Sequence, residues 1–242
     1  MIFTGIEKVV VTKMNFYVFS INCATRYVSA EDILNSSELT YGKCDKCGAD
    51  KLVIWDDVIP VFECETVTKN RTLPDIMLYG GGLQSFTHWS VVSENVRKLF
   101  EDEKLTGAQF YPAELVYQIR GKYHKLNEQY YVMSVIGKAE IDFEAMGVNC
   151  SICETCEHYI FEGKLCPART RKGIYPTIMK KDTWDGSDVF MADYCTERFV
   201  EKVLEAKLTG FEFYCFEQEY DAFENKKYFR TLSGLKKIRS QN

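Results

Sequence analysis

A 19-residue segment occurs twice in this 242-residue chain, and this internal repeat constrains the fold more than any other feature of the sequence. Residues 93–111 and 196–214 align without a gap. The identical pairs are Glu94/Glu197, Lys104/Lys207, Leu105/Leu208, Thr106/Thr209, Gly107/Gly210, Phe110/Phe213 and Tyr111/Tyr214. Because these identities keep the same order, we interpret the repeat as an internal duplication. The alternative is a common helix–strand unit that arose twice by convergence.

Each copy of the repeat has the pattern of a helix followed by a strand. Ser93 and Thr196 are predicted to cap the free amides at the helix starts. Apolar residues then recur at helical spacing. Gly107 and Gly210 are predicted to end the two helices, where a positive φ favours glycine. An apolar strand is expected after each glycine.

These features predict an α+β protein of two related halves, residues 1–124 and 125–242. Each half contains one helix–Gly–strand unit and one C-x-x-C cluster, and a polar break near residues 120–128 marks the join. The chain is 46% hydrophobic and 14% aromatic, which excludes a disordered class of protein.

The cysteines form close groups in both halves. Cys44 and Cys47 form one C-x-x-C pair, and Cys150, Cys153 and Cys156 form two overlapping pairs in the second half. In a reducing compartment such pairs indicate metal ligands before disulfides. Two pairs supply the four thiolates of a closed zinc site. We therefore predict a structural zinc ion that joins the halves.

The exact ligand set stays open at the level of sequence. The second cluster offers two registers, and Cys166 could complete a self-contained site within that half. Cys64 or Cys23 could complete a separate first site. A redox C-x-x-C would need a helix start after a strand, which the pattern around Cys44 does not show. Cysteines that bound metal only in an ancestral protein are a further alternative.

Charge and motifs restrict the class of function. Lys and Arg total 30 against 35 Asp and Glu, giving a net charge of −5 that makes nucleic-acid binding unlikely. No membrane span and no secretion leader is predicted, so the expected location is the cytoplasm. The sequence contains no G-x-S-x-G, H-E-x-x-H or P-loop pattern, and no cofactor site other than the zinc ligands is predicted. We expect a protein that is not an enzyme.

The chain resembles the double-CXXCG motif proteins of bacteria and related immunity-protein families of polymorphic toxin systems. The segments that carry the resemblance are Cys44–Gly48, the central C-x-x-C cluster, Asp188–Phe190, Thr196–Val200, Ser93–Val96, Leu105–Gly107 and Phe110–Pro112. One departure from the pattern is that Glu157, and not a glycine, follows Cys156.

This resemblance implies a non-enzymatic, cytoplasmic immunity protein that binds and neutralises a cognate toxin protein. The alternative hypothesis is a zinc-ribbon-like adaptor that binds nucleic acid or a regulatory protein. A tight one-to-one complex with the product of a neighbouring toxin gene favours the first, and salt-dependent retention of nucleic acid favours the second.

Overall fold

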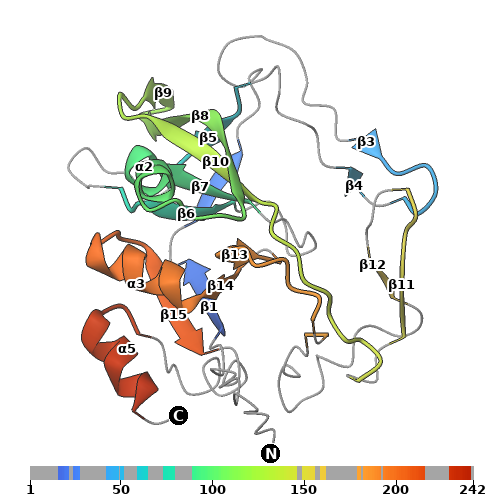
Figure 1. Ribbon diagram of the computed structural model, residues 1–242. Helices are drawn as coiled ribbons and strands as arrows, with labels where there is room; N and C mark the ends of the chain where they lie inside the picture. Colours follow the sequence, from blue (N-terminus) through green and yellow to red (C-terminus); the bar gives the residue numbers. More distant parts are fainter. Residues whose placement is uncertain are drawn as a thin grey trace, which may run out of the picture.

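The computed structural model describes residues 16–21, 24–27, 42–48, 50–51, 59–64, 73–79, 89–145, 149–155, 159–161, 179–180, 182–191, 193–215 and 229–240. Over these residues the chain is an α+β protein, built mostly of sheet with three helices, as the sequence predicts at the level of fold class (Figure 1). None of the described helices is long and apolar enough to cross a membrane.

The largest sheet has seven strands and closes on itself as a small barrel. In order across the sheet the strands are β10 (Tyr130–Val135), β7 (Trp89–Ser93), β6 (Ile76–Tyr79), β2 (Ala24–Tyr27), β5 (Val61–Glu63), β8 (Ala108–Ile119) and β9 (Lys122–Lys125). Closure occurs because β10 pairs with both β7 and β8. The 12-residue length of β8 allows this, since its first half pairs with β10 and its second half pairs with β5 and β9.

Neighbouring residues of the barrel strands face two different buried clusters, as strand geometry requires. Met77 and Val91 are paired in register and pack with Phe62 and Leu115 in one cluster. Ile76 and its partner Val92 belong to a larger cluster on the other face of the same strands. The barrel wall is thus apolar on both faces here, and its outer face takes part in the main core.

A second sheet joins segments from near both ends of the chain. Its strand order is β13 (Val189–Phe190), β14 (Tyr194–Thr196), β1 (Phe16–Ile21) and β15 (Phe211–Cys215). β1 lies between β14 and β15 and pairs antiparallel with both. The division after residue 124 stays a prediction; β10, which follows it, pairs with β7 and β8, which precede it.

The strand predicted after Gly210 is present as β15, and all five of its residues are buried. Phe211 and Phe213 belong to the main core cluster, whereas Tyr214 packs in a smaller cluster with Val18 and Phe190. Both faces of this strand are therefore covered.

Three helices lie on one side of the molecule (Figure 1). α2 (Glu94–Asp102) and α3 (Glu197–Glu205) meet in the main core, where the ring centroids of Phe100 and Phe199 are 5.7 Å apart. α5 (Leu232–Arg239) adds the buried Leu235 to the same core, and its Arg239 forms ion pairs with Glu197 and Glu201 of α3. One apolar core thus contains both copies of the repeat.

The two glycines of the repeat do not end the helices, and that prediction is wrong. Lys104 and Lys207 adopt the left-handed conformation after α2 and α3, with φ of 51° and 56°. The next residue then donates its amide to the last helical turn, as in Leu105 to the Phe100 carbonyl, which is a Schellman-type ending. The glycines come three residues later.

Close approach of another segment explains Gly107 and Gly210. A Cβ atom at Gly107 would overlap the Val189 carbonyl oxygen, and one at Gly210 would lie 2.6 Å from the Ile76 carbonyl oxygen. Both glycines also have φ near +90°. Only glycine fits such a conformation and such a contact without strain.

Two aspartates bind the Thr-Gly turns of the opposite copy. Asp75, just before β6, accepts hydrogen bonds from the amide (2.8 Å) and hydroxyl (2.9 Å) of Thr209. Asp188, just before β13, accepts hydrogen bonds from the amide (3.0 Å) and hydroxyl (3.2 Å) of Thr106. Asp75 precedes the first copy and binds the turn of the second, and Asp188 precedes the second copy and binds the turn of the first, so the contacts are reciprocal.

Each aspartate also contacts the first residue before the helix of the copy that it precedes. The hydroxyl of Thr196 donates to Asp188 (3.1 Å) and accepts from the Phe199 amide (3.3 Å), so the predicted cap is present there. Ser93 takes the predicted N-cap position of α2, but its hydroxyl donates to Asp75 (2.7 Å) and makes no capping bond. Its hydroxyl is used for the contact between segments instead.

Hydrogen bonding also sets the charge state of Asp75. Burial alone would raise the pKa of its carboxyl group. Hydrogen bonds from Thr209, Ser93 and Asn95 outweigh that effect, so the pKa lies below its usual value. Asp75 is therefore a carboxylate at neutral pH, which suits its role as an acceptor.

Candidate metal centre

Two short β-hairpins lie side by side on the side of the molecule away from the helices (Figure 1). The first consists of β3 (Gly42–Lys43) and β4 (Asp50–Lys51), and the second consists of β11 (Cys150–Ile152) and β12 (Tyr159–Phe161). Each carries one of the predicted cysteine clusters. Both cysteine clusters therefore lie on short β-hairpins.

The first cluster has the geometry of a metal-binding knuckle. Cys44 directly follows β3, and residues 45–47 form the turn. The Gly48 amide donates to the Cys44 carbonyl (2.7 Å), and Gly48 has a φ of +71° that favours glycine. The C-x-x-C-G segment thus folds back so that the Cys44 and Cys47 sulfurs lie within 4.8 Å of each other.

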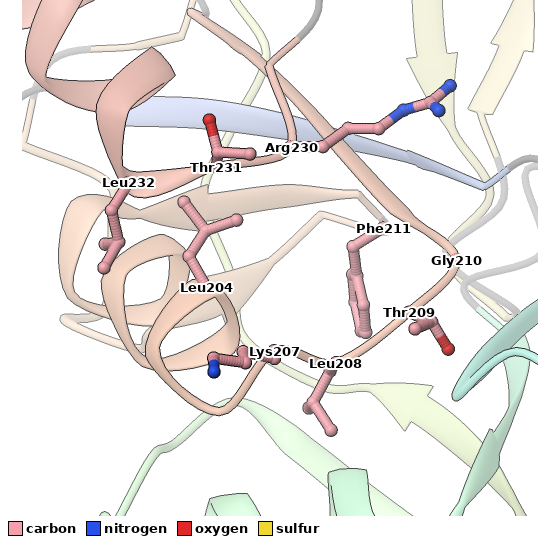
Figure 2. Close-up of a pocket in the computed structure, with 9 residues that line it drawn as sticks. All are labelled: Leu204, Lys207, Leu208, Thr209, Gly210, Phe211, Arg230, Thr231 and Leu232. Carbon is pink, nitrogen blue, oxygen red and sulfur yellow. The ribbon is translucent and has the colours of Figure 1, made fainter.

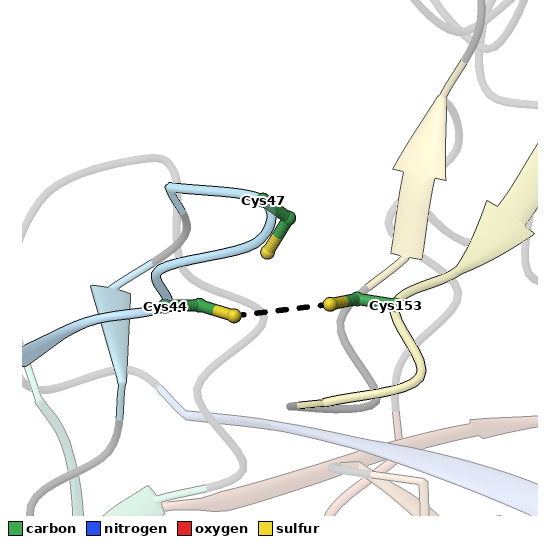
Figure 3. Close-up of side chains that lie close together, drawn as sticks. All are labelled: Cys44, Cys47 and Cys153. Atoms are coloured by element: carbon green, nitrogen blue, oxygen red, sulfur yellow. Dashed lines mark hydrogen bonds between the residues drawn. The ribbon is translucent and has the colours of Figure 1, made fainter.

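Cys153 approaches this knuckle from the second hairpin. It directly follows β11, as Cys44 directly follows β3. The Sγ atoms of Cys44, Cys47 and Cys153 lie within 4.8 Å of one another (Figure 3). Two predicted clusters that are far apart in the sequence therefore contribute to one group of thiols.

The spacing of the sulfurs suits a tetrahedral metal ion. The Cys44 and Cys153 sulfurs are 3.8 Å apart, far beyond the S–S bond length of about 2.0 Å. Four thiolates around zinc at about 2.3 Å have neighbouring sulfurs about 3.8 Å apart. Cys44 and Cys153 are buried, and Cys47 is partly exposed. Soft thiolate donors in a shielded position fit zinc better than magnesium or calcium.

An ion pair joins the two turns beside the thiols. Lys46 of the first C-x-x-C contacts Glu154 of the second cluster, and both side chains are mainly exposed. Such a surface pair contributes little to stability by itself. The signal for this ion pair in the sequence is the pair of opposite charges within the two C-x-x-C turns, which by itself does not predict that the turns meet.

The remaining predicted ligands are only partly described. Cys156 lies outside the described residues, as do the side chain of Cys150 and the alternative ligands Cys23 and Cys166. Cys64 is described, and it packs inside the barrel with Phe62, so it is not part of the thiol group.

Cys195 and Cys215 are buried in the main core and are not part of the thiol group. Burial raises the pKa of the Cys195 thiol well above its usual value, and nearby Asp193 and Asp188 add to that effect. A thiol of this kind stays protonated and is a poor ligand or nucleophile.

Comparison with known proteins gives no family for this chain: no protein-family model matches it, and no curated protein is significantly similar to it. The class that the fold and the site define is an α+β protein with a cysteine cluster that could hold a metal ion.

Proposed function

We propose that the thiol group holds a structural zinc ion and that the protein is a non-enzymatic, cytoplasmic immunity protein, which binds and neutralises a cognate toxin. The observation that carries the proposal is the meeting of Cys44, Cys47 and Cys153 from two separate hairpins. This is the double C-x-x-C arrangement on which the family resemblance depends.

Cys156 is the proposed fourth ligand. A closed zinc site needs four donors, and three thiols are already together. Cys153 and Cys156 have the same spacing as Cys44 and Cys47. Cys44 and Cys153 also take the same place after the first strand of a hairpin, which supports this register over Cys150 and Cys153. Four thiolates leave no open position for a catalytic water, so the role is structural.

The proposal includes an internal duplication. α2 and α3 have nine residues each, and both are followed at the same spacing by a left-handed lysine, a left-handed glycine and a strand. Thr106 and Thr209, which are aligned in the repeat, each bind an aspartate that precedes the other copy. Matching backbone conformations at matching positions support common ancestry of the two copies over convergence.

Binding to a toxin is the function that this scaffold suits best. Two copies that interlock, with a metal ion on the other side, give a rigid body that does not need to change shape to bind. The net charge of −5 also favours a basic protein as partner, because complementary charge speeds association.

The direct test uses the product of the gene next to its own. Expression of that product alone is expected to arrest growth, and co-expression of this protein is expected to restore it. Purified together, the two proteins are expected to form a stable one-to-one complex by calorimetry and size-exclusion chromatography. A neighbouring product that still arrests growth, and that forms no complex, would contradict the immunity function.

The zinc-ribbon-like adaptor is the second candidate. Two hairpins that share one metal are the arrangement of a zinc ribbon, and Lys46 places a cation at the tip of one of them. This candidate predicts nucleic acid that co-purifies at low salt and is released at high salt, which is measured by the absorbance ratio at 260 and 280 nm.

A further inference from the structure

An open pocket lies between the end of α3, the turn that follows it and the start of α5 (Figure 2). Its volume is about 460 Å³, within the usual range for ligand sites. The residues that define its chemistry are Leu204, Lys207, Leu208, Phe211, Arg230 and Leu232.

Most of the pocket wall is apolar. Phe211 is buried, Leu204 and Leu208 are partly buried, and the Leu232 side chain is 38% exposed. A leucine with this exposure beside other apolar side chains offers area that a partner can cover. An apolar group that enters here gains by leaving water.

Two cationic side chains line the pocket, Lys207 and Arg230, and they differ in whether a described carboxylate pairs with them. Arg230 forms an ion pair with Glu212, a buried residue of β15. No acidic side chain in the described part of the chain forms an ion pair with Lys207. Lys207 and Arg230 extend to opposite ends of the group in Figure 2, so among the described lining residues Lys207 supplies the available positive charge beside the leucines.

The first copy of the repeat has no equivalent of this pocket chemistry. Its turn keeps the same Lys-Leu-Thr-Gly sequence, but Glu101 and Ala108 stand where the second copy has Leu204 and Phe211. Glu101 forms an ion pair with Arg97 on the surface of α2. The apolar wall is therefore specific to the second copy, whereas the lysine is common to both.

We propose that this pocket is where the neutralised toxin docks, through a segment in which a large apolar side chain lies next to a carboxylate. The apolar side chain packs on Leu204, Phe211 and Leu232, and the carboxylate pairs with the Lys207 ammonium. This inference rests on the proposed immunity function and adds the surface and the chemistry of the contact.

Small probes test the pocket without the toxin. N-acetylphenylalanine carries the expected pair of groups, and its amide N-acetylphenylalaninamide lacks the charge. In a titration of the full chain followed by methyl NMR, the acid is expected to shift Leu204, Leu208 and Leu232, with the amide binding at least about threefold more weakly. Equal effects of both probes, or no shift at these leucines, would overturn the pocket proposal.

A matched pair of variants tests the same pocket in the complex. Lys207→Gly and Lys104→Gly each remove an ammonium group and relieve a left-handed backbone, so both variants should fold and unfold at higher urea concentration. Lys207→Gly is expected to weaken the toxin complex about tenfold, and Lys104→Gly is expected to change it less than about twofold. Equal effects would place the contact elsewhere, while absence of any complex with the unmodified protein would instead contradict the immunity function.

Discussion

The helix side and the hairpin side of the molecule join distant parts of the chain by different means. On the helix side, both copies of the repeat share one buried core, and reciprocal aspartate contacts hold their turns. On the hairpin side, Ile152 and Ile160 are exposed, and no described hairpin residue belongs to the three buried clusters. The described contacts between the hairpins are those of three thiols and one exposed ion pair. Packing therefore fixes the helix side, whereas under the proposed function a metal ion bound by the thiols joins the hairpin side.

Removal of a thiol should have the largest effect, because it removes the main connection on the hairpin side. Cys153→Ser is expected to release the metal and to lower the free energy of unfolding by several kcal/mol, measured by urea unfolding and elemental analysis. Cys195→Ser is the control, since it places a hydroxyl in the core and should cost about 2 kcal/mol without loss of metal. A Cys153→Ser protein that keeps its metal and its stability would contradict the claim that the thiol group holds the hairpin side together.

On the helix side, the largest effect is expected at the glycines. Gly107→Ala should lower the free energy of unfolding by about 4 kcal/mol, because the methyl group overlaps the Val189 carbonyl and the φ is left-handed. Gly210→Ala has a looser contact with Ile76 and should cost about 3 kcal/mol. Urea unfolding measures both, and a change below about 1 kcal/mol in either would contradict the close approach.

The reciprocal aspartates should have intermediate effects that differ between the copies. Asp188 is buried and also pairs with Arg198 at 2.9 Å, so Asp188→Asn should cost about 3 kcal/mol. Asp75 is less buried and forms no ion pair with a cation in the described part of the chain, so Asp75→Asn should cost about 2 kcal/mol. Denaturant unfolding of the two variants tests the order, and a larger loss at Asp75 would contradict it.

The lowered pKa of Asp75 predicts a smaller effect of pH. A carboxyl group with a lower pKa in the folded state stabilises the protein above its unfolded-state pKa of about 3.9. That stabilisation is lost as the pH falls through the folded-state pKa. Stability should therefore be constant near neutral pH and should fall in acid, with a shallower fall in Asp75→Asn. Identical acid profiles for the two proteins would show that Asp75 does not titrate as described.

The smallest expected effect is a gain in stability at the two lysines. Lys104→Gly and Lys207→Gly should each raise the free energy of unfolding by about 1 kcal/mol, since glycine adopts a left-handed backbone without strain. Thermal or urea unfolding measures the gain. A loss at either position would mean that the lysine side chain contributes packing that outweighs its strained backbone.

Local patterns in the sequence predict the elements that depend on local physics. The apolar spacing of both helices and the C-x-x-C-G knuckle at Cys44 follow from residues close together in the chain. The Leu-Thr-Gly motif does not reveal the role of its glycine, because Gly107 is required by the close approach of Val189, which lies far away in the sequence. No periodicity identifies such a neighbour.

Pairing between strands that are far apart in the chain could not be predicted from the sequence. An apolar strand pattern does not state its partner, so the position of β1 between β14 and β15 could not be predicted. Asp75 and Asp188 gave a usable signal, since each precedes an apolar pair that begins a strand. These aspartates can be recognised as hydrogen-bond acceptors only once the structure shows that Thr106 lies near Asp188 and Thr209 lies near Asp75.

The most direct test of the account is the metal content of the protein purified without a chelator and without added zinc, together with a count of reactive thiols. The account predicts about one zinc ion per chain with four protected thiols, one of them Cys156. Protein without metal, in which Cys44, Cys47 and Cys153 all react freely, would contradict it.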